Sequence, residues 1–147
     1  MHTVSRLIRM NISTFDDLLQ AATQQPHAQR LLLVFAGASA PANASPEQHA
    51  RHAAGLAGEL TPLMCVDKTP EAIESFAALC AEADQFGQAW QLVFVAGMSG
   101  QGDEPPSEAQ AQAPLEGMVQ AIKDGRMDHL IPFNRQGQAV RLRRMDG

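Results

Sequence analysis

Apolar residues recur at the spacing of one helix face in three stretches of the chain. Phe15, Leu18, Leu19 and Ala22 occupy positions i, i+3, i+4 and i+7. Two later sets repeat this spacing: Ile73, Phe76, Ala77 and Cys80, and then Leu115, Met118, Val119 and Ile122. The pattern predicts helices over residues 13–25, 69–84 and 113–125.

The residues around these stretches suit helix ends. Ser13 or Thr14 is expected to cap the first helix, Thr69 with Pro70 behind it to begin the second, and Gly125 to end the third. A fourth, weaker helix is predicted after Ser45, with a face of alanines.

Between the helices lie short apolar runs: "RLLLVFAG", "TPLMCVD", "QLVFVAG" and "HLIPF". None of them alternates polar with apolar residues. Continuous runs of this kind are typical of strands covered on both faces, as in a parallel or mixed sheet. Near the end of the chain, "IPFNRQGQAVRLR" predicts a hairpin that turns around residues 135–138.

Two of the runs resemble each other at a constant offset of 60 residues. "LLLVFAGAS" at 31–39 matches "QLVFVAGMS" at 91–99, and each is preceded by a helix and followed by a proline-containing loop and a capped helix start. We interpret this as two pseudo-repeated halves. The fold class expected is α/β: one layered domain whose mixed, mostly parallel sheet of four to five strands carries packed helices and a C-terminal hairpin. A two-layer α+β arrangement is the alternative.

Length and composition fit one globular domain. The chain has 147 residues, of which 45% are apolar and 18% charged. Residues 10–147 are expected to form the domain, and residues 1–9 to be a disordered or upstream-start extension before Met10. The net charge of −5 argues against nucleic acid as a partner, although four arginines cluster between Arg135 and Arg144.

The sequence indicates a cytoplasmic protein. It contains no apolar run long enough to span a membrane and no secretory signal. Its two cysteines, Cys65 and Cys80, match neither a redox pair nor a zinc pattern. Both are expected to be buried and inert thiols.

Candidate site residues follow from the expected sheet. Ligands of open α/β sheets bind outside the carboxyl ends of the strands. Those ends place the candidates at six positions: Ser39, Asp67, Lys68, Ser99, Gly100 and Asp103. Asp67 and Lys68 form the best isolated polar pair, either for a ligand or as a turn with local hydrogen bonds.

The glycines of "QLVFVAGMSGQGDEPPS" raise the question of a phosphate loop. Gly97, Gly100 and Gly102 give G-x-x-G-x-G, which differs from the dinucleotide fingerprint, and acids and prolines follow where a helix should open. No phosphate-loop lysine is present. Residues 98–113 are expected to form a long loop, either a lid or disordered.

No cofactor and no metal are expected. His49 and His52 lie three residues apart on the weak helix, but zinc requires three or four ligands and no suitable acid or cysteine is near. The sequence also lacks the local signatures of nucleophilic hydrolases.

Five segments together carry a family resemblance: "MNISTFDDLL", "LTPLMCVDKTPE", "FGQAWQLVFVAGMSG", "MVQAIKDG" and "FNRQGQAV". The chain from Met10 onward resembles a family of small proteobacterial proteins that often carry the label "ribonucleotide reductase subunit alpha". Reductase large subunits are several times longer and need a radical cysteine and a redox cysteine pair. The resemblance therefore implies a small bacterial family and transfers no catalytic residue.

Two classes of function stay open. The first is a non-catalytic binding or accessory module that presents its loops and sheet edge to a protein partner or to a second copy of itself. The alternative is a small-molecule or nucleotide-handling enzyme, linked to ribonucleotide metabolism, that uses Asp67, Lys68 and Ser99 at the strand ends. The sequence favours the first, because no acid, base and nucleophile converge.

Overall fold

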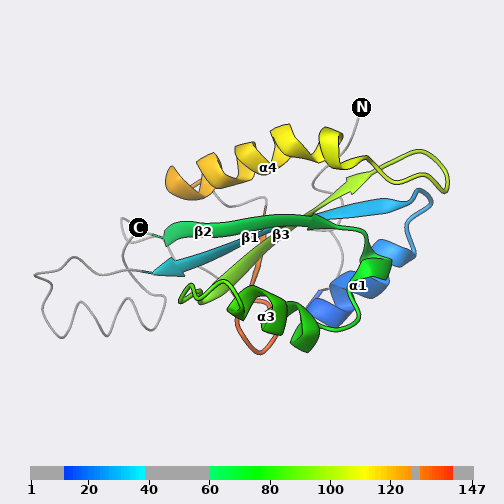
Figure 1. Ribbon diagram of the computed structural model, residues 1–147. Coiled ribbons are helices and arrows are strands. Elements are labelled where there is room, and N and C mark those ends of the chain that lie inside the picture. Colours follow the sequence, from blue (N-terminus) through cyan, green and yellow to red (C-terminus); the bar gives the residue numbers. More distant parts are fainter. Residues whose placement is uncertain (1–11, 39–59, 127–129, 141–147) are drawn as a thin grey trace, which may run out of the picture.

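The computed structural model describes residues 12–38, 60–126 and 130–140. Within them, four strands form one sheet in the order β2-β1-β3-β4 (Figure 1). The bounds are Gln29–Ala38 for β1, Leu60–Lys68 for β2, Leu92–Ser99 for β3 and Ile131–Phe133 for β4. Each neighbouring pair of strands is antiparallel.

The prediction of a mostly parallel sheet is therefore wrong. The apolar runs of β1 and β3 do belong to strands that are covered on both faces, but burial on both faces does not determine strand direction. β2 and β3 run in the same direction with α3 in their connection, yet β1 lies between them and pairs antiparallel with both. The alternation of helices and strands along the chain could not reveal this intervening strand.

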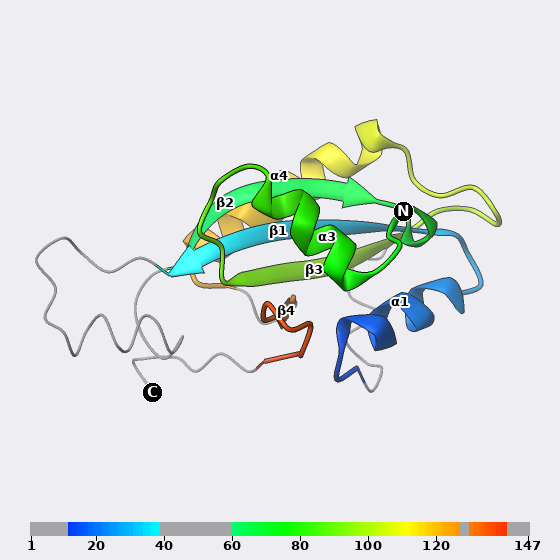
Figure 2. The same ribbon diagram turned by 60° about the horizontal axis from the view of Figure 1, so that its bottom comes forward.

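In the described part of the chain, three α-helices and one short turn of 3₁₀-helix pack on the sheet. The helices are α1 (Phe15–Thr23), α3 (Phe76–Asp84) and α4 (Glu108–Lys123), and the 3₁₀ turn η2 covers Pro70–Ala72. α4 covers one face of the sheet, and α1 and α3 cover the other (Figures 1 and 2). The result is three layers, which differs from the two-layer alternative.

Side-chain caps determine where the helices begin. Thr14 caps α1 and accepts a hydrogen bond from the Asp17 N–H, as predicted. The second predicted helix begins later than expected, because the Ser75 hydroxyl accepts from the Ala78 N–H and caps α3 there. Ile73, before this cap, has extended backbone.

The third predicted helix begins earlier than expected. Ser107 and Gln110 form a reciprocal capping box, so α4 begins at Glu108. Pro114 lies inside α4. The apolar spacing begins only at Leu115, whereas the capped helix start predicted after the 91–99 run is where α4 begins.

Alternation along the two central strands builds two apolar layers. Leu33 and Phe35 of β1 pack towards α1 and α3, together with Phe15, Leu18, Trp90, Val93 and Phe133. Leu32 and Val34 pack towards α4, together with Phe94, Met98, Leu115, Met118 and Ile122. Each central strand therefore contributes to both layers, which is why β1 is apolar at every position from Leu31 to Ala36 and β3 from Leu92 to Ala96.

β2 is an edge strand, and its burial differs from that of β1. Cys65 is exposed and Cys80 is half-buried, so the prediction that both thiols are buried is wrong. Cys65 pairs with Val34 and shares its face, the α4 side, but at the margin of the sheet no side chain covers it fully. Burial raises the pKa of the Cys80 thiol above its ordinary value.

The C-terminal hairpin closes against α1 and α3. The Asn134 N–H donates to the Gln138 carbonyl, and Gly137 has a positive φ of 78° in the turn. Arg135 in this turn lies over the ring of Trp90, 4.2 Å from its centroid. Its guanidinium also donates to both carboxylate oxygens of Asp84, at 3.0 and 2.8 Å, and thereby joins the hairpin to the end of α3.

The Asp84 contact predicts a specific acid sensitivity. Hydrogen bonds from Arg135 hold the pKa of the Asp84 carboxyl below its ordinary value of 3.8. A lowered folded-state pKa contributes stability above the unfolded-state pKa, and this contribution is lost as pH falls through the folded-state pKa. Asp84→Asn should therefore lower the free energy of unfolding at neutral pH, with the deficit shrinking below about pH 4. Urea unfolding of both proteins across this range measures it; a deficit independent of pH would contradict the assignment.

Several predictions concern residues outside the described ranges. They are the extension over residues 1–9, the weak helix after Ser45, the histidines His49 and His52, and Ser39 as a site residue.

Candidate functional site

The antiparallel sheet changes which predicted residues can meet. The start of β1, the end of β2 and the end of β3 share one end of the sheet, since Leu31 pairs with Lys68 and Gln29 pairs with Ser99. The end of β1 lies at the opposite end, where Ala38 pairs with Leu60. Ser39, which follows Ala38, is outside the described residues. The carboxyl ends of the strands therefore do not all lie at the same end of the sheet.

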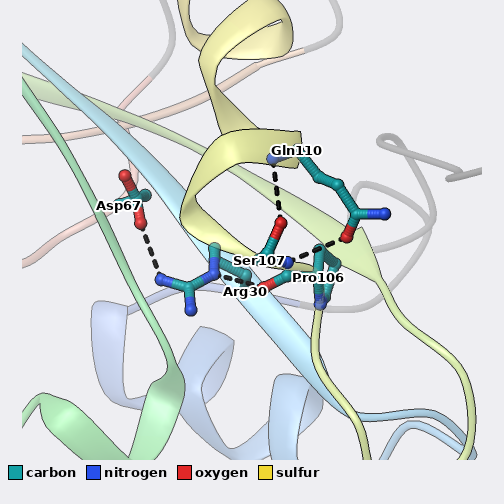
Figure 3. A network of polar contacts seen from close by, with 5 residues as sticks. All are labelled: Arg30, Asp67, Pro106, Ser107 and Gln110. Carbon is teal, nitrogen blue, oxygen red and sulfur yellow. Dashed lines mark hydrogen bonds and ion pairs between the residues drawn. The ribbon is translucent and has the colours of Figure 1, made fainter.

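Arg30 organises the end of the sheet that carries Asp67. Its Nη1 lies 2.6 Å from Asp67 Oδ1, and both side chains are only about one-seventh exposed. Its Nε donates to the Pro106 carbonyl, just before the cap of α4 at Ser107 (Figure 3). One guanidinium thus joins β1, β2 and the start of α4.

Asp67 and Lys68 were predicted as a pair, but they lie on opposite faces of the sheet. Asp67 is opposite Leu32, on the α4 side. Lys68 is opposite Leu31, on the α3 side, and its Nζ lies 3.1 Å from Glu82 Oε1. Consecutive strand residues point to opposite faces, so a neighbouring pair in a strand does not form one site.

Ser99, Gly100 and Asp103 lie at the other side of Arg30, at the end of β3. The Ser99 hydroxyl accepts from Gln29 Nε2 at 2.8 Å. Gln101 and Glu104 exchange two backbone hydrogen bonds of 2.9 Å, and the turn between them has Gly102 at φ 57°. Asp103 is exposed at its tip. Positive φ at the first central position alone is the type II′ pattern.

Backbone contacts and backbone conformation explain why Gly100 and Gly102 are glycines. A Cβ on Gly100 would lie 2.0 Å from the Glu104 carbonyl oxygen. The Ala28 backbone also accepts from the Gly100 N–H and donates to the Gly102 carbonyl, which fastens the turn to the start of β1. Residues 98–113 therefore do not form the long loop that was predicted. A hydrogen-bonded turn follows β3, and the chain then enters α4 at its cap, Ser107.

A second feature lies beside β2, and the sequence did not predict it. An apolar pocket of about 180 Å³ opens between β2 and α3. Its apolar lining includes Phe35, Met64, Val66, Leu79, Ala83 and Phe86. Lys68 and Glu82, which pair with each other, contribute its polar wall.

Phe86 stands out at this pocket. Its side chain is 67% exposed, and it is the one large hydrophobic residue with such exposure in the part of the chain that the structure describes. The sequence offered a signal, since Phe86 is an isolated aromatic in the polar stretch "ADQFGQ". Arg30 could also have been noticed in the sequence, because it is a charged residue at the start of an otherwise apolar strand.

The outer side of β2 lies next to this pocket. β2 is the last strand of the sheet, so one row of its backbone groups has no strand partner among the described residues. The same residues contain no group of three or more His, Cys, Asp or Glu side chains placed to hold a metal ion. None of the helices in the described ranges is both long and apolar enough to cross a bilayer.

Comparison with protein-family models found no match, and comparisons with curated proteins and with solved structures found none either.

Proposed function

We propose that the protein is a non-catalytic binding module of the cytoplasm, which adds an extended segment of a protein partner to the outer edge of β2, where no other described strand pairs. The observation that carries the proposal is the outer row of β2 backbone groups, beside which the apolar pocket opens. Strand addition at such an edge derives affinity from main-chain hydrogen bonds and selectivity from pockets for alternate side chains. Two unpaired thiols, Cys65 and Cys80, suit a reducing compartment.

Only part of the β2 edge suits this role. The register with β1 shifts between Phe35 and Ala36, which leaves Leu63 as the extra residue of a bulge next to Pro62. Bulges and prolines are devices that keep edge strands from pairing. Residues 64–68 pair regularly with β1 and contain neither a bulge nor a proline, and the charges of Asp67 and Lys68 are paired with Arg30 and Glu82. We therefore place the binding edge there.

The size and charge of this edge favour a short segment over a second copy of the chain. Residues 64–68 span roughly 17 Å, and a single added strand there covers a few hundred Å² at most. Stable association of two folded chains buries about 1,200 Å² or more. Two copies would also each carry a net charge of −5 and repel one another.

The enzyme alternative has less support from the described side chains. Asp67 pairs with Arg30, Lys68 pairs with Glu82, and the Ser99 hydroxyl accepts from Gln29. Each candidate is thus engaged with a neighbour in the same chain, and they point in different directions.

We also propose that the two halves are related copies, in keeping with the resemblance to the small proteobacterial family labelled as a reductase subunit. β1 and β3 are central and antiparallel, and Val34 pairs with Phe94, its counterpart at the 60-residue offset. α1 and α3, which precede these strands, are each nine residues long and lie on the same face. These features support a pseudo-twofold axis between Val34 and Phe94.

The binding proposal is tested with Cys65 as a built-in probe of the β2 edge. In a Cys80→Ser background it is the sole cysteine of the full-length chain, and it is exposed. Peptides selected from a displayed library of random unstructured sequences should slow labelling of Cys65 by a maleimide at least about tenfold at saturation, because the added strand covers its edge. Amide hydrogen exchange over residues 64–68 should slow in parallel.

A matched control separates edge binding from a general effect. Glu116 lies on the exposed side of α4, so Glu116→Cys in a chain without its native cysteines should label at one rate with and without peptide. If no selected peptide protects Cys65, or if protection grows with protein concentration alone, the peptide-binding proposal is wrong.

A further inference from the structure

On the basis of the proposed function, we infer that the partner segment inserts one large, uncharged apolar side chain into the pocket between β2 and α3, where Phe86 covers it. The proposed function requires only the backbone edge. This inference specifies the chemistry of the partner at one position of the added strand.

The register of β2 points the required side chain at the pocket. Met64 and Val66 pair with Phe35 and Leu33, whose side chains pack on the α3 side of the sheet. Residues directly opposite in an antiparallel pair share a face, so Met64 and Val66 face α3 as well. A strand added beside β2 would follow the same alternation. Every second side chain of it would therefore point towards the pocket.

The volume of the pocket fits one side chain. It measures about 180 Å³, and an apolar protein cavity of about 150 Å³ is large enough to hold a benzene molecule. A phenylalanine, leucine, isoleucine or methionine side chain is therefore of suitable size. Alanine or valine would leave part of the space unfilled.

The charges at the pocket favour an uncharged side chain. Lys68 and Glu82 are its only charged lining residues in the described part of the chain, and they pair with each other at 3.1 Å. An acidic side chain would have to displace Glu82, and a basic one would have to displace Lys68. Since the remaining lining is apolar, a buried charge there would lack a partner.

Phe86 supplies the exposed apolar surface that a bound side chain would cover. It lines the pocket, yet 67% of its side chain is accessible. Aromatic residues at the centre of an interface often contribute most of its affinity. Phe86 comes two residues after the last residue of α3, so shortening its side chain changes no residue of the helix.

The inference is tested on peptides that already protect Cys65. Their aligned sequences should share one position restricted to large apolar residues. Phe86→Ala should weaken their binding about tenfold, whereas Gln85→Ala, an exposed neighbour that does not line the pocket, should change it less than about twofold. Ala83→Met, which fills the pocket from α3, should shift selection at that position towards small residues.

The outcomes distinguish this inference from the proposed function. Peptides that protect Cys65 but show no apolar position, and that bind Phe86→Ala as tightly as the unchanged chain, would overturn the inference and leave the edge proposal standing. A restricted position occupied by acidic or basic residues would overturn it as well. Selection on Phe86→Ala is informative even if Ala83→Met fails to fold, because Phe86 is exposed and its truncation leaves the core intact.

Discussion

Replacing Gly100 by alanine is expected to destabilise the folded chain by about 3 kcal/mol. The new Cβ would lie 2.0 Å from the Glu104 carbonyl oxygen and 2.8 Å from the Pro105 Cα. Both contacts are with backbone, so no side-chain rotation relieves them. The turn between Gln101 and Glu104 would have to open, and the hydrogen bonds that fasten it to Ala28 would weaken. Urea unfolding measures the loss.

Gly117→Ala is the matched control for this change. Gly117 lies within α4 and has no heavy atom within 4 Å of an added Cβ. Alanine is favoured over glycine inside a helix, so this variant should be more stable by about 1 kcal/mol. If both substitutions shifted stability in the same direction, the steric account of Gly100 would be wrong.

Breaking the Arg30–Asp67 pair is expected to have an effect of similar size. Asp67→Leu leaves the mostly buried Arg30 guanidinium without its carboxylate and should cost about 3 kcal/mol. Arg30→Met should cost at least as much, because the Pro106 carbonyl also loses its donor. The double variant buries no unpaired charge, so it should be less destabilised than either single variant. Its total loss of stability should be about 1 kcal/mol.

The double-mutant cycle measures the coupling directly. Urea unfolding of the four proteins should give a coupling energy of about 5 kcal/mol, the amount by which the two single losses together exceed the loss of the double variant. Additive losses would instead mean that Arg30 acts through its contact with the start of α4 alone. The two arms are separable, since Asp67→Leu removes only the contact with β2.

The sequence pattern was enough to predict that the helices exist. The residues at which they begin are set by capping hydrogen bonds. Phe15 to Ala22 and Leu115 to Ile122 have the period of a helix face, and helices lie there. The start of α3 depended on the Ser75 hydroxyl, which competed with the equally plausible Thr69-Pro70 start. Local hydrogen bonding decides between such starts, and a periodic pattern does not record it.

The candidate site was predicted less well than the helices. The polar character of Asp67, Lys68 and Ser99 was visible in the sequence, but their grouping assumed that strand carboxyl ends meet at one edge. In an antiparallel sheet those ends alternate between two edges. Arg30 became important only because the fold placed it between Asp67 and the Pro106 carbonyl.

The amino-acid pattern alone located the described helices and strands and indicated that β1 and β3 are covered on both faces, but it wrongly indicated the same for β2. These properties depend on the local spacing of apolar residues, which any fold must bury. The antiparallel order of the strands and the place of β2 at the edge, with its pocket beside α3, became known from the tertiary structure alone. Strand partners are chosen by contacts between residues far apart in the chain, and no local pattern encodes which side of a strand stays open.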